Sequence, residues 1–312
     1  MENLLFAFKV VFPVFAMMVI GYVLKSVGVI SEVTVRQVNK MLFRVCLPFM
    51  IFTNIYSTDQ QINFQSRLVL FTVIAIAAEF VIGLFLVLAF EKDNSKRGVM
   101  LQGMFRSNFV FFGIPIVTAI AGTASAGMAS LLIAVVIPLF NFLAVIALEI
   151  FHGSRPNFFK IIKGIVTNPL ILASAAALLV LHFNIQLPDY IAGTIRDIGS
   201  ISTPLAFLML GAYFSFGDIG VYLRQITVTS LFKLLLFPAV ILGAAIWMGF
   251  RGAELAVLLS VFASPVAINS FTMAQEMGGD ERLAGQLIVF TSILSVASVF
   301  LFVFILRQFA ML

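Results

Sequence analysis

The chain has few charged residues, one cysteine and one tryptophan. Charged residues make up only 11% of its 312 positions, whereas 62% are hydrophobic. Soluble domains are about a quarter charged, so this composition excludes a water-soluble enzyme. Cys46 is the single cysteine and cannot form a disulfide within the chain. We expect it to pack as a small apolar side chain.

The sequence also lacks the motifs of the common hydrolases, metal sites and ATP-driven pumps. It contains no HExxH, no GxSxG, no GxxxxGK[ST] and no Cys/His cluster with metal-ligand spacing. We therefore predict a protein that is not an enzyme and that has no metal and no cofactor. Without an ATP site, any uphill transport must draw on an ion gradient or on the membrane potential, with H⁺ or Na⁺ as the candidate coupling ions.

The net charge of +5 does not indicate a nucleic-acid partner, because the basic residues sit in short gaps between apolar stretches. Membrane proteins keep their topology signals in such gaps. One set of gaps collects Lys25, Arg36 and Lys40; Lys92, Lys96 and Arg97; Arg155, Lys160 and Lys163; Arg224; and Arg282. We therefore expect membrane lipid, and no nucleic acid, around this chain.

Ten apolar stretches are long enough to cross a hydrocarbon core about 30 Å thick, which takes roughly 20 helical residues. They lie near residues 5–25, 38–56, 67–90, 98–121, 125–151, 158–181, 190–215, 222–248, 254–276 and 284–307. The gaps between them are too short for a soluble domain. The sequence thus predicts an all-α polytopic membrane protein with ten transmembrane helices.

The basic gaps follow spans 1, 3, 5, 7 and 9, so the positive-inside tendency makes them cytoplasmic and puts both termini outside. Each half of the chain then holds five spans. Because five is odd, the second half enters the bilayer inverted relative to the first. We predict a first five-helix repeat over residues 1–152 and a second, inverted one over residues 157–312.

Similar motifs recur in the two halves. The stretch from Phe105 to Gly122 is echoed 157 residues later by the stretch from Phe262 to Gly279. Each is an apolar span interrupted by Ser, Asn, Gly or Pro near its middle. Paired interrupted spans in the two halves of a membrane protein indicate the substrate site of a secondary transporter.

These two interrupted spans, the fourth and the ninth, supply the candidate binding residues. Proline and glycine weaken a helix, so Gly113, Pro115 and Pro265 predict helices broken near mid-membrane. Half-helix N-termini carry partial positive charge and free donors that suit an anion, and Asn108 and Asn269 bring amides to the same level. The alternative is a pair of Pro-kinked helices whose Asn side chains bridge neighbouring spans.

Three ionisable residues, Glu79, Arg106 and Lys233, fall near the middle of spans 3, 4 and 8. Ionisable groups at that depth are expensive, and they are usually functional, paired or both. One interpretation is a charge network in which Glu79 exchanges a coupling proton while Arg106 or Lys233 holds a carboxylate. The other is a structural salt bridge inside the bundle.

At these residues the chain resembles the auxin efflux carrier family, whose bacterial members include malonate and malate permease-like proteins. The matching stretches are Leu47-Pro48, Asn108 with Gly113-Ile114-Pro115, Asn168-Pro169-Leu170, Thr203-Pro204-Leu205-Ala206 through Leu210-Gly211, and Ser264-Pro265 with Asn269 and Phe271. Plant members carry a proline near the position of Ser270, which we include among the expected substrate-binding residues.

The resemblance implies a fold similar to the bile-acid/sodium symporters, with ten helices in two inverted repeats. Spans 1, 2, 6 and 7 would form a scaffold, spans 3–5 and 8–10 a transport unit, and broken helices 4 and 9 would cross beside the substrate. It also implies a bacterial cytoplasmic membrane and homodimers. Together these features predict a secondary active carrier of small organic acid anions, working by elevator-like alternating access.

Three alternatives to this function stay open from the sequence. One is a sodium-coupled symporter of larger amphipathic anions, which the shared fold suggests. Another is a passive facilitator or channel, which would lack the saturation and counterflow of a carrier. The last is a membrane sensor that binds its ligand without moving it.

Overall fold

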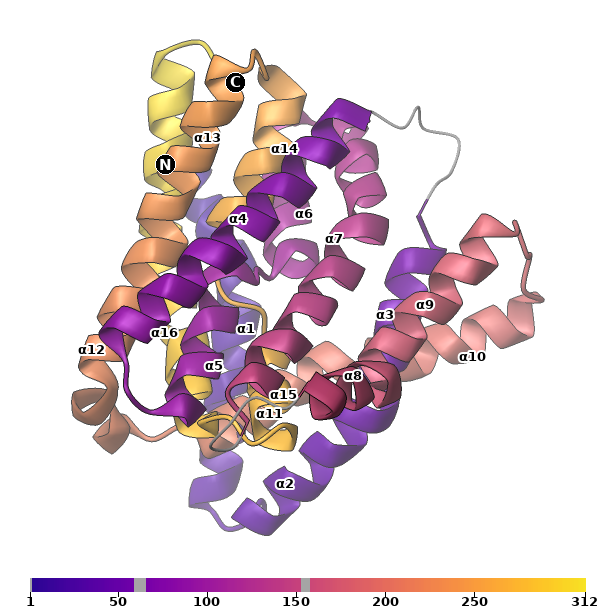
Figure 1. The fold of residues 1–312 in the computed structure, drawn as a ribbon, viewed down its shortest axis with the longest axis vertical. Helices are drawn as coiled ribbons and strands as arrows, with labels where there is room; N and C mark the ends of the chain where they lie inside the picture. The colour runs from indigo at the N-terminus through magenta and orange to yellow at the C-terminus, as the bar shows by residue number, and fades with distance from the viewer. Residues whose placement is uncertain (1, 59–65, 153–157) are drawn as a thin grey trace.

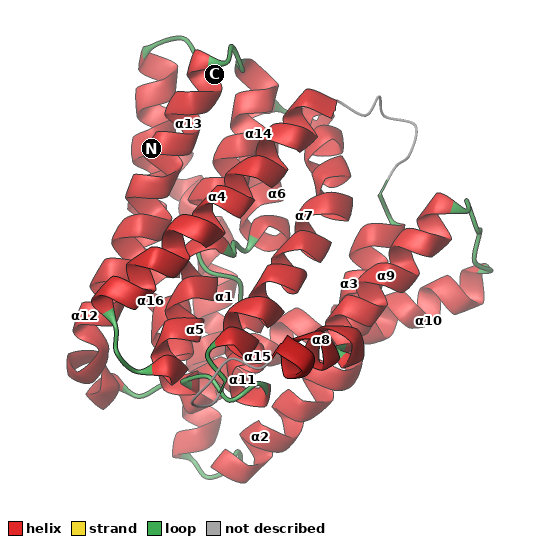
Figure 2. Cartoon of the chain, viewed as in Figure 1, coloured by secondary structure: helices red, strands yellow, loops and turns green. Residues whose placement is uncertain are grey.

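The structure, a computed structural model, describes residues 2–58, 66–152 and 158–312, and in these ranges it is helical without a strand (Figure 1, Figure 2). The link between the two predicted halves, residues 153–157, lies outside the described part. The helices are α1 (Glu2–Ser26), α2 (Glu32–Met41), α3 (Leu47–Tyr56), α4 (Ser66–Phe90), α5 (Asn94–Phe105), α6 (Ile114–Ala121), α7 (Thr123–Ile150), α8 (Phe158–Thr167), α9 (Pro169–His182), α10 (Asp189–Ser200), α11 (Ser202–Tyr213), α12 (Ile219–Leu231), α13 (Phe237–Trp247), α14 (Gly252–Ala263), α15 (Asn269–Glu276) and α16 (Glu281–Gln308).

Five helical segments of the described chain are long and apolar enough to cross a membrane. They are Glu32–Tyr56, Arg67–Phe90, Met128–Ile150, Phe216–Trp247 and Glu281–Gln308, and shorter apolar helices lie between them. The all-helical membrane class predicted from composition is therefore confirmed. The exact arrangement as ten spans in an inverted repeat stays a prediction.

Three π-helical turns each end two residues before a proline. They span Leu42–Cys46, Phe109–Gly113 and Phe232–Leu236, and they precede Pro48, Pro115 and Pro238. A proline ring has no N–H and clashes with the carbonyl four residues earlier. A widened turn relieves that clash without ending the helix. This is why α2 runs on into α3, and α12 into α13, in spite of the prolines.

The predicted span 158–181 is divided at Asn168 into α8 and α9. The side chain of Asn168 accepts a hydrogen bond of 2.9 Å from the backbone N–H of Leu170, and Pro169 follows at the first helical position. This is a typical start of a new helix. In Figure 1, α8 accordingly points in a different direction from α9.

Two sets of helices pack mainly within themselves. In the first set, α1 lies along α11, and α3 lies against α9 and α10. In the second, α5 packs on α4 and α7, α6 on α7 and α14, and α12 on α16. Between the sets, α3, α8 and α9 touch α7, and α1, α2 and α11 touch α15 and α16. We call them the first and second helix sets below.

The loops that carry most of the basic residues lie together at one end of the molecule. The backbone N–H of Asp280 donates to the carbonyl of Ser95 over 3.1 Å, and His152 Nδ1 lies 2.9 Å from the carbonyl oxygen of Met277. In Figure 1 this is the lower end, below α5, α11 and α15. The charge pattern of the sequence therefore corresponds to one physical face.

The contact between α1 and α11 is made by backbone. A Cβ added at Gly21 would overlap the carbonyl oxygen of Leu208, and one at Gly211 would overlap the carbonyl oxygen of Met18. Small residues let membrane helices approach this closely, and van der Waals packing then holds them. The pair Gly21 and Gly211 thus determines how closely these two helices pack.

We expect Gly211→Ala to lower the melting temperature of the purified protein, because backbone cannot move aside as a flexible side chain can. Overpacking costs about 1–3 kcal/mol. Gly193→Ala is the control, since no heavy atom lies within 4 Å of the added Cβ. It should be neutral or stabilising, as alanine favours a helix by about 0.8–1 kcal/mol over glycine. Equal melting temperatures for both variants would contradict the close-packing account.

Candidate functional site

Two broken helices cross inside the second set. Helix α5 ends at Phe105 and resumes as helix at Phe109, while α14 ends at Ala263 and α15 begins at Asn269. Arg106 and Ser264, the first residues after each break, are extended, and Ser107 pairs with Val266 in an antiparallel bridge. The backbone N–H of Asn108 donates to the carbonyl of Pro265 over 2.8 Å. We call residues 106–108 and 264–268 the crossover.

Local chemistry explains the second break better than the first. Ser264 precedes a proline, which pushes it to extended backbone, and its φ of −68° and ψ of 149° agree. The N–H of Val266 then finds a partner in Thr291 Oγ1 of α16, at 3.2 Å. Gly113 and Pro115 were expected to break the other span. The break lies instead at Arg106–Asn108, because the π-helical turn accommodates Pro115.

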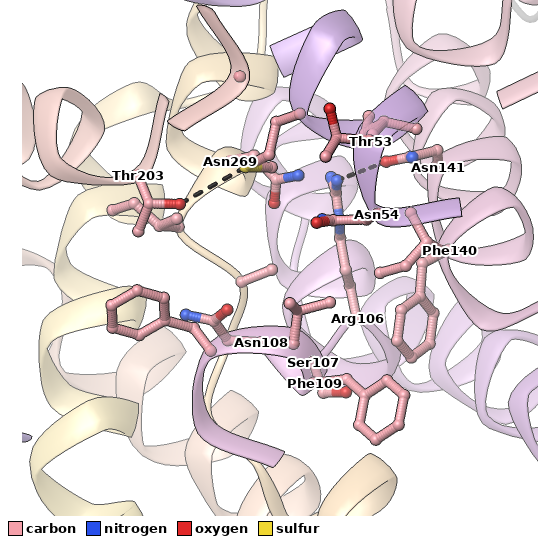
Figure 3. A pocket seen from close by; sticks show the side chains of 18 of the residues that line it. Thr53, Asn54, Arg106, Ser107, Asn108, Phe109, Phe140, Asn141, Thr203 and Asn269 are labelled. Atoms are coloured by element: carbon pink, nitrogen blue, oxygen red, sulfur yellow. Dashed lines mark hydrogen bonds between the residues drawn. The ribbon is translucent and has the colours of Figure 1, made fainter. Parts of the chain in front are cut away.

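A cavity of about 340 Å³ lies beside the crossover (Figure 3). The first helix set contributes α3, α10 and α11 to its wall, and the second contributes α7 and the crossover. Its polar lining residues are Thr53, Asn54, Arg106, Ser107, Asn108, Asn141, Arg196, Ser200, Thr203 and Asn269. The cavity thus lies between the two sets.

Arg106 is the buried charge of this cavity. Only 2% of it is exposed, and its Nη2 donates a 2.7 Å hydrogen bond to Asn141 Oδ1, while Nη1 touches the sulfur of Met273. Among the described residues it forms no ion pair. A guanidinium has five donors and keeps its charge, and a buried cation without a counter-ion is costly. A carboxylate in the cavity would supply the missing charge.

The amides of Asn108 and Asn269, which the sequence places at the same level of two spans, both line the cavity. Within the described chain neither side chain forms a hydrogen bond, and Figure 3 shows them around the same space as Asn54 and Arg106. An amide can donate to one carboxylate oxygen while a guanidinium donates to the other. The structure therefore brings Arg106, Asn108 and Asn269 together.

The start of the half-helix α15 has fewer free backbone N–H donors for an anion than the sequence suggested. At the start of α15, the N–H groups of Ser270 and Phe271 already donate to the carbonyls of Ala267 and Ile268, at 3.0 and 3.1 Å. The N-terminal donors that the sequence suggested for an anion are partly engaged here. The positive charge of this cavity comes from side chains, the buried Arg106 and the exposed Arg196.

Four predicted site residues do not line the cavity. Gly113 allows close packing, because a Cβ there would crowd the ring of Phe109 and lie 3.1 Å from the carbonyl of Ser260. Pro115 opens α6, and Pro265 holds the crossover through its carbonyl. Ser270 is buried and its carbonyl accepts from Gln102 Nε2 at 3.2 Å. These residues shape the site without facing it.

Glu79 and Lys233 do not line the cavity, and Lys233 lies next to the end of α5 that precedes the crossover. Both are almost wholly buried, at 1% and 0% exposure, and close enough to interact electrostatically. Lys233 Nζ lies 3.4 Å from the carbonyl oxygen of Phe105, at the negative end of α5. Neither carboxylate oxygen of Glu79 has a hydrogen-bond partner in the described structure, and no salt bridge joins the two residues there.

The sequence interpretation missed Asn54, Asn141 and Arg196. Asn54 and Asn141 are single amides in the apolar runs LPFMIFTNIY and IPLFNFLAV. Polar side chains in such runs are expensive and usually mark an interior or functional face, so a signal was present. Arg196 lies near the start of an expected span and carried no comparable signal.

Comparison with known proteins identifies the family to which the chain belongs. The chain matches the membrane transport protein family over residues 6–303, and it belongs to that family, which is the auxin efflux carrier family that its motifs resemble. An uncharacterized transporter of Methanothermobacter thermautotrophicus is 27% identical, covering 93% of this chain and 95% of the relative. An uncharacterized transporter of Methanocaldococcus jannaschii is 23% identical, covering 95% and 98%. The chain is therefore an integral membrane protein of a transporter family.

We expect small carboxylates to raise the melting temperature of the wild type and Arg106→Gln to abolish that rise. It should leave the melting temperature without ligand nearly unchanged, because removing an uncompensated buried cation offsets the lost bond to Asn141, worth about 1.5–3 kcal/mol. Differential scanning fluorimetry with a panel of mono- and dicarboxylates makes the measurement. Arg224→Gln, at an exposed position, is the control. A collapse of stability in Arg106→Gln alone would instead assign the guanidinium a structural role.

Proposed function

We propose that this protein is a secondary carrier of small organic acid anions. One observation carries the proposal: a buried guanidinium without a carboxylate partner in the described chain faces a cavity where two broken helices cross. Crossed, discontinuous helices are typical of transporter substrate sites. Arg106 holds one oxygen of the substrate carboxylate, and the amides of Asn108 and Asn269 hold the other.

The size of the cavity favours a small substrate. Ligand pockets range over about 300–1,000 Å³, and 340 Å³ lies near the lower limit. Apolar side chains such as Ile137 and Phe140 complete the wall and would contact a short carbon skeleton. This argues against the larger amphipathic anions that a sodium-coupled symporter of the related fold would carry.

Alternating access follows from the division of the cavity wall. In this proposal the first helix set (α1–α3 and α8–α11) is the scaffold, and the second (α4–α7 and α12–α16) is the transport unit. The ten spans then form two inverted repeats over residues 1–152 and 157–312. A substrate bound to the crossover moves with the transport unit past α3, α10 and α11. Movement of this kind is the elevator mechanism.

The orientation follows from charge. The basic loops that meet near Ser95 and Asp280 form the cytoplasmic end by the positive-inside tendency, and both termini lie outside. For a bacterial member of the family, the membrane is the cytoplasmic one. The cavity then opens away from the cytoplasm, since it is lined by the outer parts of α3 and α10.

Glu79 is the proposed coupling group. It has no hydrogen-bond partner among the described residues and faces Lys233, whose ammonium contacts the end of α5 just before Arg106. A proton taken up by Glu79 changes the charge next to the half-helix that carries the substrate. Net transport is then coupled to the pH gradient.

For the amides, we expect Asn108→Ala and Asn269→Ala each to lower substrate affinity about tenfold or more while the protein still folds. The reason is the loss of hydrogen bonds to a charged group, worth about 1.5–3 kcal/mol each. Proteoliposome uptake and counterflow measure this, with the buried Asn168→Ala, outside the cavity wall, as a control for general damage. Wild-type uptake in both variants would make them helix-packing groups, and flux without counterflow would indicate a channel.

For the coupling group, we expect Glu79→Gln to keep substrate exchange and to lose the dependence of net uptake on a pH gradient. Glutamine keeps the shape of the protonated carboxyl group but cannot exchange a proton. If the carboxylate serves only to pair with Lys233, its removal should cost about 3–5 kcal/mol of stability. Melting temperature and flux, each measured with and without the gradient, distinguish the two. A stable variant whose uptake still follows the gradient would remove Glu79 from the mechanism.

A further inference from the structure

A carboxylate at the basic end of the molecule joins the two helix sets. Glu281, the first residue of α16, accepts a hydrogen bond of 3.1 Å from Arg36 Nη2 of α2. The hydroxyl of Tyr213, the last residue of α11, donates to the same oxygen. Both donors belong to the first set and Glu281 belongs to the second. Contacts between these sets must break if one moves past the other.

A second polar contact lies one helical turn deeper. Asn39 of α2 donates from Nδ2 to Gln275 Oε1 of α15 over 2.6 Å, and Asn39 is fully buried. The remaining polar atoms, Asn39 Oδ1 and Gln275 Nε2, have no partner in the described part of the chain. Two side-chain amides that face each other can form two hydrogen bonds, and this pair forms only one of them. We call Arg36, Asn39, Tyr213, Gln275 and Glu281 the latch.

An apolar layer continues from the latch between the two sets. Its buried side chains include Leu42, Cys46 and Phe207 of the first set, and Phe271 and Ile288 of the second. The ring of Tyr213 lies 5.4 Å from that of Phe271, so the latch and the layer are contiguous. Between the latch and the crossover, the two helix sets therefore contact each other largely through apolar side chains.

The cavity lies at the other ends of the same scaffold segments. Helix α2 carries the latch and its continuation α3 lines the cavity at Met50 and Asn54. Likewise Tyr213 ends α11, whereas Arg196 and Gly199 of the preceding α10 line the cavity. The cavity and the latch therefore lie at opposite ends of these scaffold segments. The described conformation is closed on the latch side.

We propose that the latch and its apolar layer form the gate that closes the route from the cavity to the basic, cytoplasmic end, and that opens once in each transport cycle. This inference rests on the carrier proposed above. Its chemistry suits repeated opening: an ion pair with a 62% exposed arginine is weak, and the half-bonded amide pair loses a single hydrogen bond. The apolar layer supplies the barrier to water.

The chain carries a natural reporter of this gate. Cys46 is the single cysteine of the sequence, only 4% exposed, and it lies inside the apolar layer and outside the cavity wall. A closed gate shields its thiol from alkylation. An open gate exposes it to water and to a small maleimide.

The test measures the rate at which N-ethylmaleimide alkylates Cys46 in the purified full-length protein. Glu281→Gln should raise that rate about threefold or more. Asp218→Asn is the matched control: Asp218 pairs with Arg282 at the same end, its side chain is 18% exposed against 19% for Glu281, and both partners lie within one helix set. Asp218→Asn should leave the rate unchanged.

Two outcomes would overturn the gate. One is the same labelling rate in both variants, whether raised or not. The other is a fall in the melting temperature of Glu281→Gln that alone accounts for its faster labelling.

A second measurement locks the gate instead of loosening it. Asn39→Cys with Gln275→Cys, in a Cys46→Ser background, is bridged by a short bifunctional thiol reagent that a reductant cleaves. Uptake should stop on bridging and return on reduction.

Full uptake by the bridged protein would show that the latch stays closed during transport, and the gate would be rejected while the carrier stands. Conversely, if the wild type moves no carboxylate, the carrier proposal fails. The labelling comparison would still report whether Glu281 holds the two sets together. The two failures are therefore distinguishable.

Discussion

The arrangement of the site depends on which partners form hydrogen bonds with the backbone N–H and carbonyl groups freed at the two helix breaks. In lipid, a freed N–H or carbonyl is tolerated only if protein or a watery cavity satisfies it. Here the Asn108 N–H bonds the Pro265 carbonyl, and Thr291 accepts from Val266. These bonds let the chain run extended at mid-depth, and so let Arg106 and the two amides face one space. A continuous helix would point them in different directions.

The second constraint is charge. Lys233 lies against the carbonyl end of α5, and one residue further Arg106 turns into the cavity, so two buried cations flank one helix terminus. Among the described residues Glu79 is the carboxylate that balances Lys233 electrostatically, and Arg106 has no carboxylate partner there. In the proposed carrier, this uncompensated cation favours an anionic substrate, so substrate binding and structural stability would be linked at this helix terminus.

Much of this could be predicted from residues alone. The paired motifs around Asn108 and Asn269 located both crossing segments, and the Ser264-Pro265 step located one break correctly. The first break was misplaced at Gly113-Ile114-Pro115, because a π-helical turn accommodates the proline, and that turn packs against α14. Asn168-Pro169 is a typical helix start, but it lies inside the apolar run 158–181, which was taken as one span. The roles of Asn54 and Arg196 depend on which helices meet, which no local pattern specifies.

The glycine contact between α1 and α11 has a mechanical consequence. Where Gly21 and Gly211 meet, backbone presses on backbone, with no long side chain between them to bend or change rotamer. This contact makes α1 and α11 a rigid pair of helices. In the proposed carrier, the opposing helices would move past this rigid pair, and little of the free energy of substrate binding would be spent on deforming it.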